Sequence, residues 1–77
     1  MARFTDYALW KMDQRGMEQD DVELVLADPE CDFPSRESPR HIYARRIGGR
    51  RLYVLVEPYD HDCVVNAFIP RPEDRRI

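Results

Sequence analysis

The stretch RHIYARRIGGRRLYVLV, residues 40–56, decides the fold, because it combines the period-two pattern of β-strands with a glycine pair near its centre. Apolar and polar side chains alternate before Gly48 and Gly49, and a mostly apolar run follows them. Two strands at about residues 41–46 and 51–57 are therefore expected to form an antiparallel hairpin. The same stretch holds five arginines and no acid, so this hairpin is also the first candidate for a binding surface.

The register of the hairpin depends on the length of its loop. A two-residue turn, formed by the glycines alone, points Arg45 toward the core, whereas a three-residue loop that includes Ile47 keeps Arg45 on the other face. Because burial of an unpaired arginine costs several kcal/mol, we expect the three-residue loop. Arg45 then lies directly opposite Arg51. The core is expected to receive alternate residues of both strands: Ile42, Ala44, Leu52, Val54 and Val56.

The face turned away from the core is expected to be polar and aromatic, and it carries His41, Tyr43, Arg45, Arg51, Tyr53, Asn66 and Phe68. Arginines that face each other across two strands repel unless an acid or an anion lies between them. Two explanations stay open: an acidic side chain or water neutralises the pair, or the pair binds phosphate. Tyrosines between the arginines fit stacking of unpaired bases, and they also fit ordinary strand propensity.

The residues before the hairpin predict two helices. Thr5 is suited to cap a first helix, which Gly16 ends. Acids at residues 18–21 lie in the first turn of a second helix, and Asp28 followed by Pro29 ends it.

A third strand at about residues 63–69 follows the turn-rich PYDHD segment, and a short edge strand is expected near residues 31–33. The expected core side of the third strand consists of Cys63, Val65, Ala67 and Ile69. The sequence thus predicts one α+β domain over residues 1–70, in which two N-terminal helices pack on a three- or four-stranded antiparallel β-meander. Residues 71–77 are expected to form a polar C-terminal tail.

Charge is spread unevenly along the chain, whose formal net charge is −3. Residues 1–34 carry nine acids and three bases, whereas residues 35–56 carry six arginines and one acid. Such a dipolar domain steers a polyanion to one face, or lets copies of itself and charged partners dock. Neither a signal peptide nor a membrane-spanning run is visible, so a cytoplasmic protein without membrane contact is expected. The two cysteines lack metal-ligand spacing, and no metal or cofactor is expected.

The order of motifs resembles a family of small bacterial proteins, a domain of unknown function distantly similar to RelE and MqsR type toxins of the barnase and RelE ribonuclease superfamily. The resemblance extends from FTDYALWKMDQRGMEQDDVELVLADPE through RHIYARRIGGRRLYVLV to DCVVNAFIP. The matching positions are Phe4, Thr5, Ala8, Arg15, Gly16 and the stop at Asp28 and Pro29. Tyr7 stands where the family has a histidine, and Asn66 or Ala67 falls near a position where the family often has threonine.

The resemblance implies a RelE-like fold and a metal-independent endoribonuclease, in which the 2′-hydroxyl of single-stranded RNA attacks the adjacent phosphate. This chemistry needs a base, an acid and cations around the phosphate. The candidates are His41 as base, Tyr53 or Tyr7 as acid, Arg45 with Arg51 as phosphate clamp, and Tyr43 with Asn66 as further RNA contacts. His61, in the PYDHD turn, is a weaker candidate.

The alternative is a non-catalytic interaction module that keeps the same fold. Its partner would be an antitoxin-like protein or a second copy of the chain. The acidic first third and the basic middle favour docking. A chain of 77 residues can form only a small core, and dimerisation would add to its stability. Trp10 and Met17 either cover such an interface or pack in the core.

Overall fold

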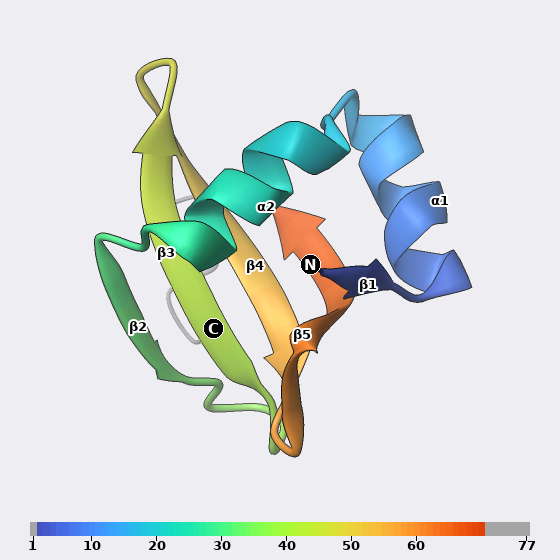
Figure 1. The fold of residues 1–77 in the computed structure, drawn as a ribbon, viewed down its shortest axis with the longest axis vertical. Helices are drawn as coiled ribbons and strands as arrows, with labels where there is room; N and C mark the ends of the chain where they lie inside the picture. The colour runs from blue at the N-terminus through green and yellow to red at the C-terminus, as the bar shows by residue number, and fades with distance from the viewer. Residues whose placement is uncertain (1, 71–77) are drawn as a thin grey trace.

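Two helices cover one face of a five-stranded sheet in the computed structural model, which describes residues 2–70 (Figure 1). The elements in chain order are β1 (Arg3–Phe4), α1 (Asp6–Arg15), α2 (Gln19–Ala27), β2 (Cys31–Pro34), β3 (His41–Ile47), β4 (Arg50–Glu57) and β5 (Asp60–Phe68). The predicted tail, residues 71–77, lies outside the described residues. Neither helix of the described chain has the length and hydropathy needed to cross a bilayer.

The strand order in the sheet is β1-β5-β4-β3-β2. The α+β class is confirmed, but the sheet is mixed rather than purely antiparallel, because β1 runs parallel to β5. Phe4 lies beside Val64 in this pair. A strand of two residues is too short to show the alternating pattern that identifies strands in a sequence. The edge strand expected near residues 31–33 is β2.

Both helices begin and end close to the predicted residues. The Thr5 hydroxyl accepts a hydrogen bond from the Ala8 N–H at 3.0 Å, which satisfies one of the free N–H groups in the first turn. Gly16 ends α1 in the left-handed conformation, with φ at 67°, which glycine adopts without steric cost. Asp28 ends α2, and its N–H donates to the Leu24 carbonyl at 2.9 Å.

The β3–β4 hairpin differs from the prediction in its loop. Gly48 and Gly49 form a two-residue turn, with φ angles of 59° and 81°, and Ile47 pairs with Arg50. The expected three-residue loop is therefore wrong. Positive φ at both central positions is the geometry that matches the twist of two-residue hairpins.

The different register places Arg45 on the helix-covered face, where it pairs with Leu52 across the strands. The expected Arg45–Arg51 pair is wrong, because Arg46 lies opposite Arg51 instead. The three-residue loop was expected because an inward Arg45 would be unpaired, but Arg45 has a partner. Its Nη1 donates to the Asp28 carbonyl oxygen at 2.9 Å and to the Asp28 carboxylate at 3.1 Å. The end of α2 thus satisfies the charge.

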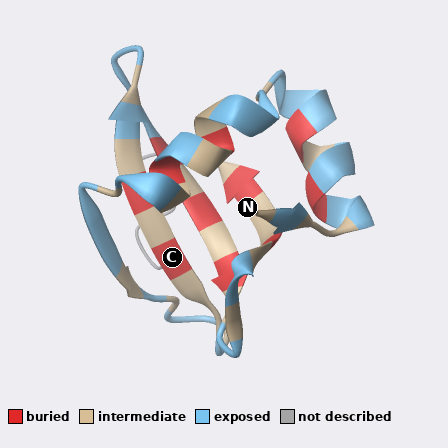
Figure 2. Cartoon of the chain, in the orientation of Figure 1, coloured by how far each residue is buried: buried red, intermediate tan, exposed pale blue. Residues whose placement is uncertain are grey.

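The main core lies between the helices and this face of the sheet (Figure 2). Its buried residues are Ala8, Met12, Val22, Val25, Leu52, Val54, Val56, Val64 and Ala67. Strand β4 contributes as predicted, whereas the predicted contribution of Ile42 and Ala44 to the same side is wrong. Both are buried, but they pair with Leu55 and Tyr53 and therefore lie on the opposite face.

The predicted alternation along β5 is also wrong in its first half. Val56 pairs with Val64 while Leu55 pairs with Asn66, which leaves Val65 as an extra residue in a β-bulge. The bulge changes which residues face the core, so that Val64 and not Val65 is buried there. Ala67 is buried as expected.

Candidate functional site

The sheet divides the predicted site residues between its two faces. His41, Tyr43 and Arg45 lie on the helix-covered face, because their strand partners belong to the core side of β4. Arg51 and Tyr53 lie on the other face of the sheet, which we call the open face. The predicted base His41 and the predicted acid Tyr53 are therefore on different faces, and the two arginines of the predicted phosphate clamp do not meet.

Tyr7 lies apart from both groups, whereas Asn66 pairs with Leu55 and lies on the open-face side of β5. The Tyr7 side chain is exposed on α1 and packs beside the Trp10 ring. The Asn66 Oδ1 accepts hydrogen bonds from Arg15 Nη1 at 2.9 Å and from the Ala67 N–H at 2.9 Å. Tyr7 and Asn66 line one shallow hollow together. The amide of Asn66 thus has a structural role in holding α1 against β5.

Three aromatic rings form a row across the open face. Phe33 of β2 and Tyr53 of β4 meet edge to face, with ring centroids 5.5 Å apart. Tyr53 and Phe68 of β5 lie 5.7 Å apart at a tilt of 60°. All three side chains are half-buried, so each ring leaves part of its surface accessible. The row offers flat apolar surface of the kind on which nucleic-acid bases stack.

Two arginines stand next to this row. Arg46, near the end of β3, and Arg51, near the start of β4, are directly opposite each other beside the hairpin loop. Both are exposed, and within residues 2–70 no ion pair or side-chain hydrogen bond holds either guanidinium. Arg51 precedes Tyr53 by two positions on the same face of β4, a spacing of roughly 7 Å. Two facing cations without a counterion favour an anion between them.

The opposite end of β4 does not neutralise these arginines. Glu57 is paired with Arg40 there, with 2.6 Å between Oε1 and Nε. Hydrogen bonds from Arg40 and then from Tyr59 lower the pKa of Glu57. This acid is therefore already compensated, and the Arg46–Arg51 pair keeps its positive charge.

A second group of polar residues lies on the helix-covered face beyond the helices. We call Asp32, His41, Tyr43 and His61 the histidine cluster. His41 Nε2 lies 2.7 Å from Asp32 Oδ1, and His61 Nδ1 lies 2.7 Å from the Tyr43 hydroxyl oxygen. The two imidazole rings stack, with centroids 5.1 Å apart and planes 10° from parallel. The cluster joins β2, β3 and β5.

The charges around the histidine cluster are negative. Burial raises the pKa of Tyr43, and the nearby carboxylates of Asp32 and Asp62 raise it further. The same negative potential that disfavours a tyrosinate also disfavours a bound phosphate. No group of three histidine, cysteine or acidic side chains among the described residues is arranged to hold a metal ion. The two carboxylates thus make the cluster a poorer site for an anion than the Arg46–Arg51 pair.

Part of each group was not predicted from the sequence. Arg46 and Phe33 had no expected role, because the wrong register moved Arg46 off the open face and Phe33 belongs to a short edge strand. His61 was only a weak candidate, because a turn residue has no fixed direction in a sequence. The aromatic residues at alternating positions were the only signal of the ring row, and they are equally typical of ordinary strands.

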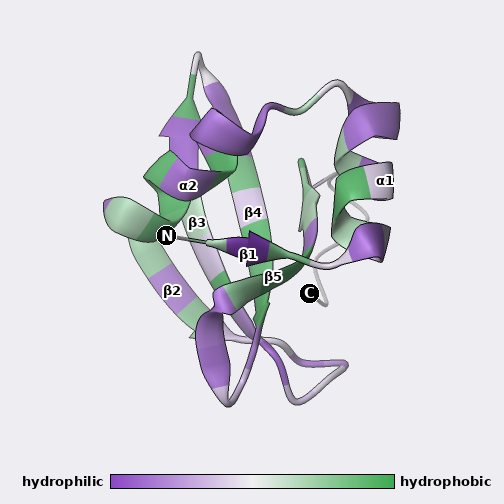
Figure 3. Cartoon of the chain, turned by 45° about the vertical axis from the view of Figure 1, so that its right-hand side comes forward, coloured by the Kyte–Doolittle hydropathy of each residue, from purple (hydrophilic) through white to green (hydrophobic). Residues whose placement is uncertain are grey.

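Figure 3 shows how hydrophilic segments are distributed over the helices and along the strands near the hairpin loop.

No protein-family model matches this chain, and neither a curated protein nor a solved structure shows significant similarity to it. The resemblance to RelE and MqsR type toxins therefore stays a prediction from the sequence.

Proposed function

We propose that this chain binds single-stranded RNA across the open face of its sheet. The observation that carries the proposal is the Arg46–Arg51 pair, which has no counterion within residues 2–70 and stands beside the ring row. Arginines contact phosphates, and exposed rings stack on unpaired bases. The strands of a duplex hide their bases from such a surface, so single-stranded RNA is the expected ligand.

The geometry favours binding over cleavage. Cleavage by the 2′-hydroxyl needs a base, an acid and cations around one phosphate. The two histidines lie on the other face of the sheet from Arg46 and Arg51. The carboxylates of Asp32 and Asp62 lie near this cluster, where they add to the effect of burial in raising the pKa of Tyr43. The two halves of a ribonuclease site are therefore separated.

A metal-independent endoribonuclease is the second candidate function. It is favoured by one observation, the stacked imidazoles of His41 and His61 with the Tyr43 hydroxyl 2.7 Å from His61. Such a pair supplies a base and an acid if a substrate phosphate reaches the cluster. Cleavage by this cluster would survive EDTA and would be lost in His61→Gln.

The proposal includes a RelE-like arrangement of the fold. Its support is the order of two N-terminal helices followed by four strands, β2 to β5, that pair antiparallel with their neighbours. The short parallel strand β1 is an addition to that arrangement.

The test measures binding of a short fluorescent single-stranded RNA by anisotropy over a range of salt concentrations. The matched variants are Arg51→Gln and Arg50→Gln, because Arg50 is the adjacent residue of β4 and its side chain points to the opposite face. Arg51→Gln should weaken binding about three- to tenfold and lower the salt dependence by roughly one phosphate contact. Arg50→Gln should leave both unchanged.

Equal losses in the two variants would mean that the effect is only net charge, and would contradict binding at the open face. Wild-type protein that shows no salt-sensitive binding would exclude RNA as the ligand. A denaturing gel of the same samples, with and without EDTA, separates binding from cleavage. Intact RNA together with salt-sensitive binding is the expected result.

A further inference from the structure

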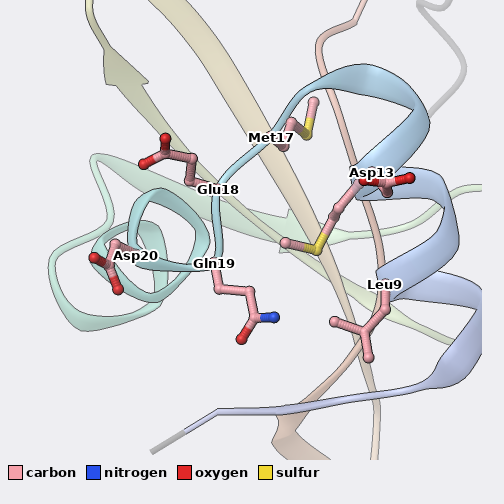
Figure 4. A pocket seen from close by; sticks show the side chains of 7 residues that line it. Leu9, Asp13, Met17, Glu18, Gln19 and Asp20 are labelled. Atoms are coloured by element: carbon pink, nitrogen blue, oxygen red, sulfur yellow. The ribbon is translucent and has the colours of Figure 1, made fainter.

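A hollow of about 520 Å³ lies where the two helices meet (Figure 4). Its lining consists of Leu9, Met12, Asp13, Met17, Glu18, Gln19 and Asp20. The apolar part comes from a leucine and two methionines, and Leu9 is 37% exposed. Methionine side chains adapt their shape to whatever packs against them. The floor of the hollow therefore suits a slender, uncharged segment from outside.

The rim of the hollow is acidic. Asp13, Glu18 and Asp20 are all exposed, and no described residue forms an ion pair with their side chains. Asp13 lies on the α1 side of the apolar floor, and Glu18 and Asp20 lie on the α2 side (Figure 4). An occupant with a slender, uncharged tip and positive charges beside it would complement this surface.

The end of the β3–β4 hairpin has the matching chemistry. Gly48 and Gly49 form a narrow tip without side chains, and an added Cβ at either glycine would meet nothing within 4 Å. Arg46 and Arg51 form the second cross-strand pair back from the tip and are exposed. The hairpin extends past α2 at the end of the sheet (Figure 1), so a neighbouring molecule has access to it.

The hollow and the hairpin end are neighbours in one molecule. Met17 lines the hollow, and it also lines a small pocket together with Ile47 and Arg50 of the hairpin. An acidic hollow beside a basic tip forms a self-complementary patch. Two copies related by a twofold axis satisfy such a patch reciprocally, which closes the assembly at a dimer.

We propose that two copies of this chain associate through this patch, each inserting its Gly48–Gly49 tip into the helix hollow of the other. Arg46 and Arg51 then face the acidic rim of the neighbouring copy, where Asp13 and Asp20 lie. The contact is held by opposite charges around a small apolar centre, so it weakens as salt rises. The inference does not depend on RNA binding, although RNA would compete for the same arginines.

Charge reversal tests the inference. One variant carries Asp13→Lys and Asp20→Lys, and the other carries Arg46→Glu and Arg51→Glu. Light scattering at low salt, from the low micromolar to the millimolar range, should show a dimer for wild type and a monomer for each variant alone. An equimolar mixture of the variants should form a heterodimer, because one contact then keeps the native arginine–aspartate charges and the other pairs the introduced glutamates with the introduced lysines.

The matched control is Glu30→Lys with Asp62→Lys, which changes net charge by the same amount at exposed positions outside the hollow. This control should dimerise like wild type. Circular dichroism confirms folding of each variant, and recovery in the mixture shows that both are folded even if one is less stable.

A monomeric wild type at every concentration would overturn the inference and would leave the hollow to a basic segment of another protein. A mixture that stays monomeric would also overturn it. The first variant leaves the open face intact and its arginines uncovered, so it should still bind RNA, at least as tightly as wild type. Loss of dimerisation with retained RNA binding therefore separates this inference from the proposed function.

Discussion

Replacement of Arg45 by alanine tests the hairpin register directly, because the two registers give this side chain opposite roles. With the two-residue turn, Arg45 Nη1 donates to the carbonyl and carboxylate oxygens of Asp28 and ties β3 to the end of α2. With a three-residue loop, Arg45 would lie on the open face opposite Arg51. The first role is structural, whereas the second would be a role in binding.

The expected loss of unfolding free energy is about 1.5 kcal/mol. The hydrogen bond to the Asp28 carbonyl contributes about 1 kcal/mol, and the ion pair with the exposed Asp28 carboxylate contributes about 0.5 kcal/mol. The Arg45 Nε is buried without a described hydrogen-bond partner, which is unfavourable. The stability gained by removing this group offsets the stability lost with the packing of the aliphatic part of the side chain. A loss of this size lowers Tm by about 6–12 °C in a domain of this length.

The assay compares urea and thermal unfolding of wild type, Arg45→Ala and Arg51→Ala by circular dichroism, together with RNA anisotropy. Arg45→Ala should be less stable but bind RNA normally under conditions where it is folded. Arg51→Ala should lie within about 0.5 kcal/mol of wild-type stability and bind RNA more weakly. The reverse pattern would refute the two-residue turn and return Arg45 to the open face.

Three further results are expected. Gly49→Ala should cost about 1 kcal/mol in urea unfolding, because φ is 81° there and no atom obstructs the new Cβ; an unchanged midpoint would contradict the turn. The pKa of Tyr43 is raised above 10.0 by burial and nearby acids, so the stability that this phenol contributes is full below pH 10.0 and falls as pH rises toward the folded pKa. Asp62→Asn should move the ultraviolet titration of Tyr43 to lower pH, and an unmoved curve would show that the Asp62 carboxylate does not raise the pKa of Tyr43. Tyr53→Leu should weaken RNA binding about tenfold, whereas Tyr59→Leu, on the β4–β5 turn, should not; equal binding in both variants would count against stacking.

The features that the sequence predicted well depend on local chemistry. Thr5 caps α1, Gly16 ends it, and Asp28 ends α2, because each feature involves groups only a few residues apart. The strands beginning at His41 and ending at Glu57 were also located from their alternating pattern. These local features are the same in the sequence and in the structure, because no contact with a distant residue changes them.

The register could not be predicted because its cost depended on a distant partner. An inward Arg45 is unfavourable only while it is unpaired, and Asp28 lies seventeen positions earlier in the sequence. The same limit applies to His61, whose hydrogen bond to Tyr43 spans eighteen positions. Neither contact leaves a periodic signal, so the sequence alone gave no reason to choose it.

The two-residue turn has one consequence that reaches from the core to the candidate site. It places the buried residues of β3, Ile42 and Ala44, on the face opposite to the buried residues of β4. Apolar side chains on both faces need cover, and the open face has no helix over it among the described elements (Figure 1). The rings of Phe33, Tyr53 and Phe68 lie on that face and are only half-buried. The ring row therefore covers the second apolar layer while it keeps accessible aromatic surface beside Arg46 and Arg51, and for that reason a substitution that removes a ring should affect stability and binding together, whereas one that removes an arginine should affect binding alone.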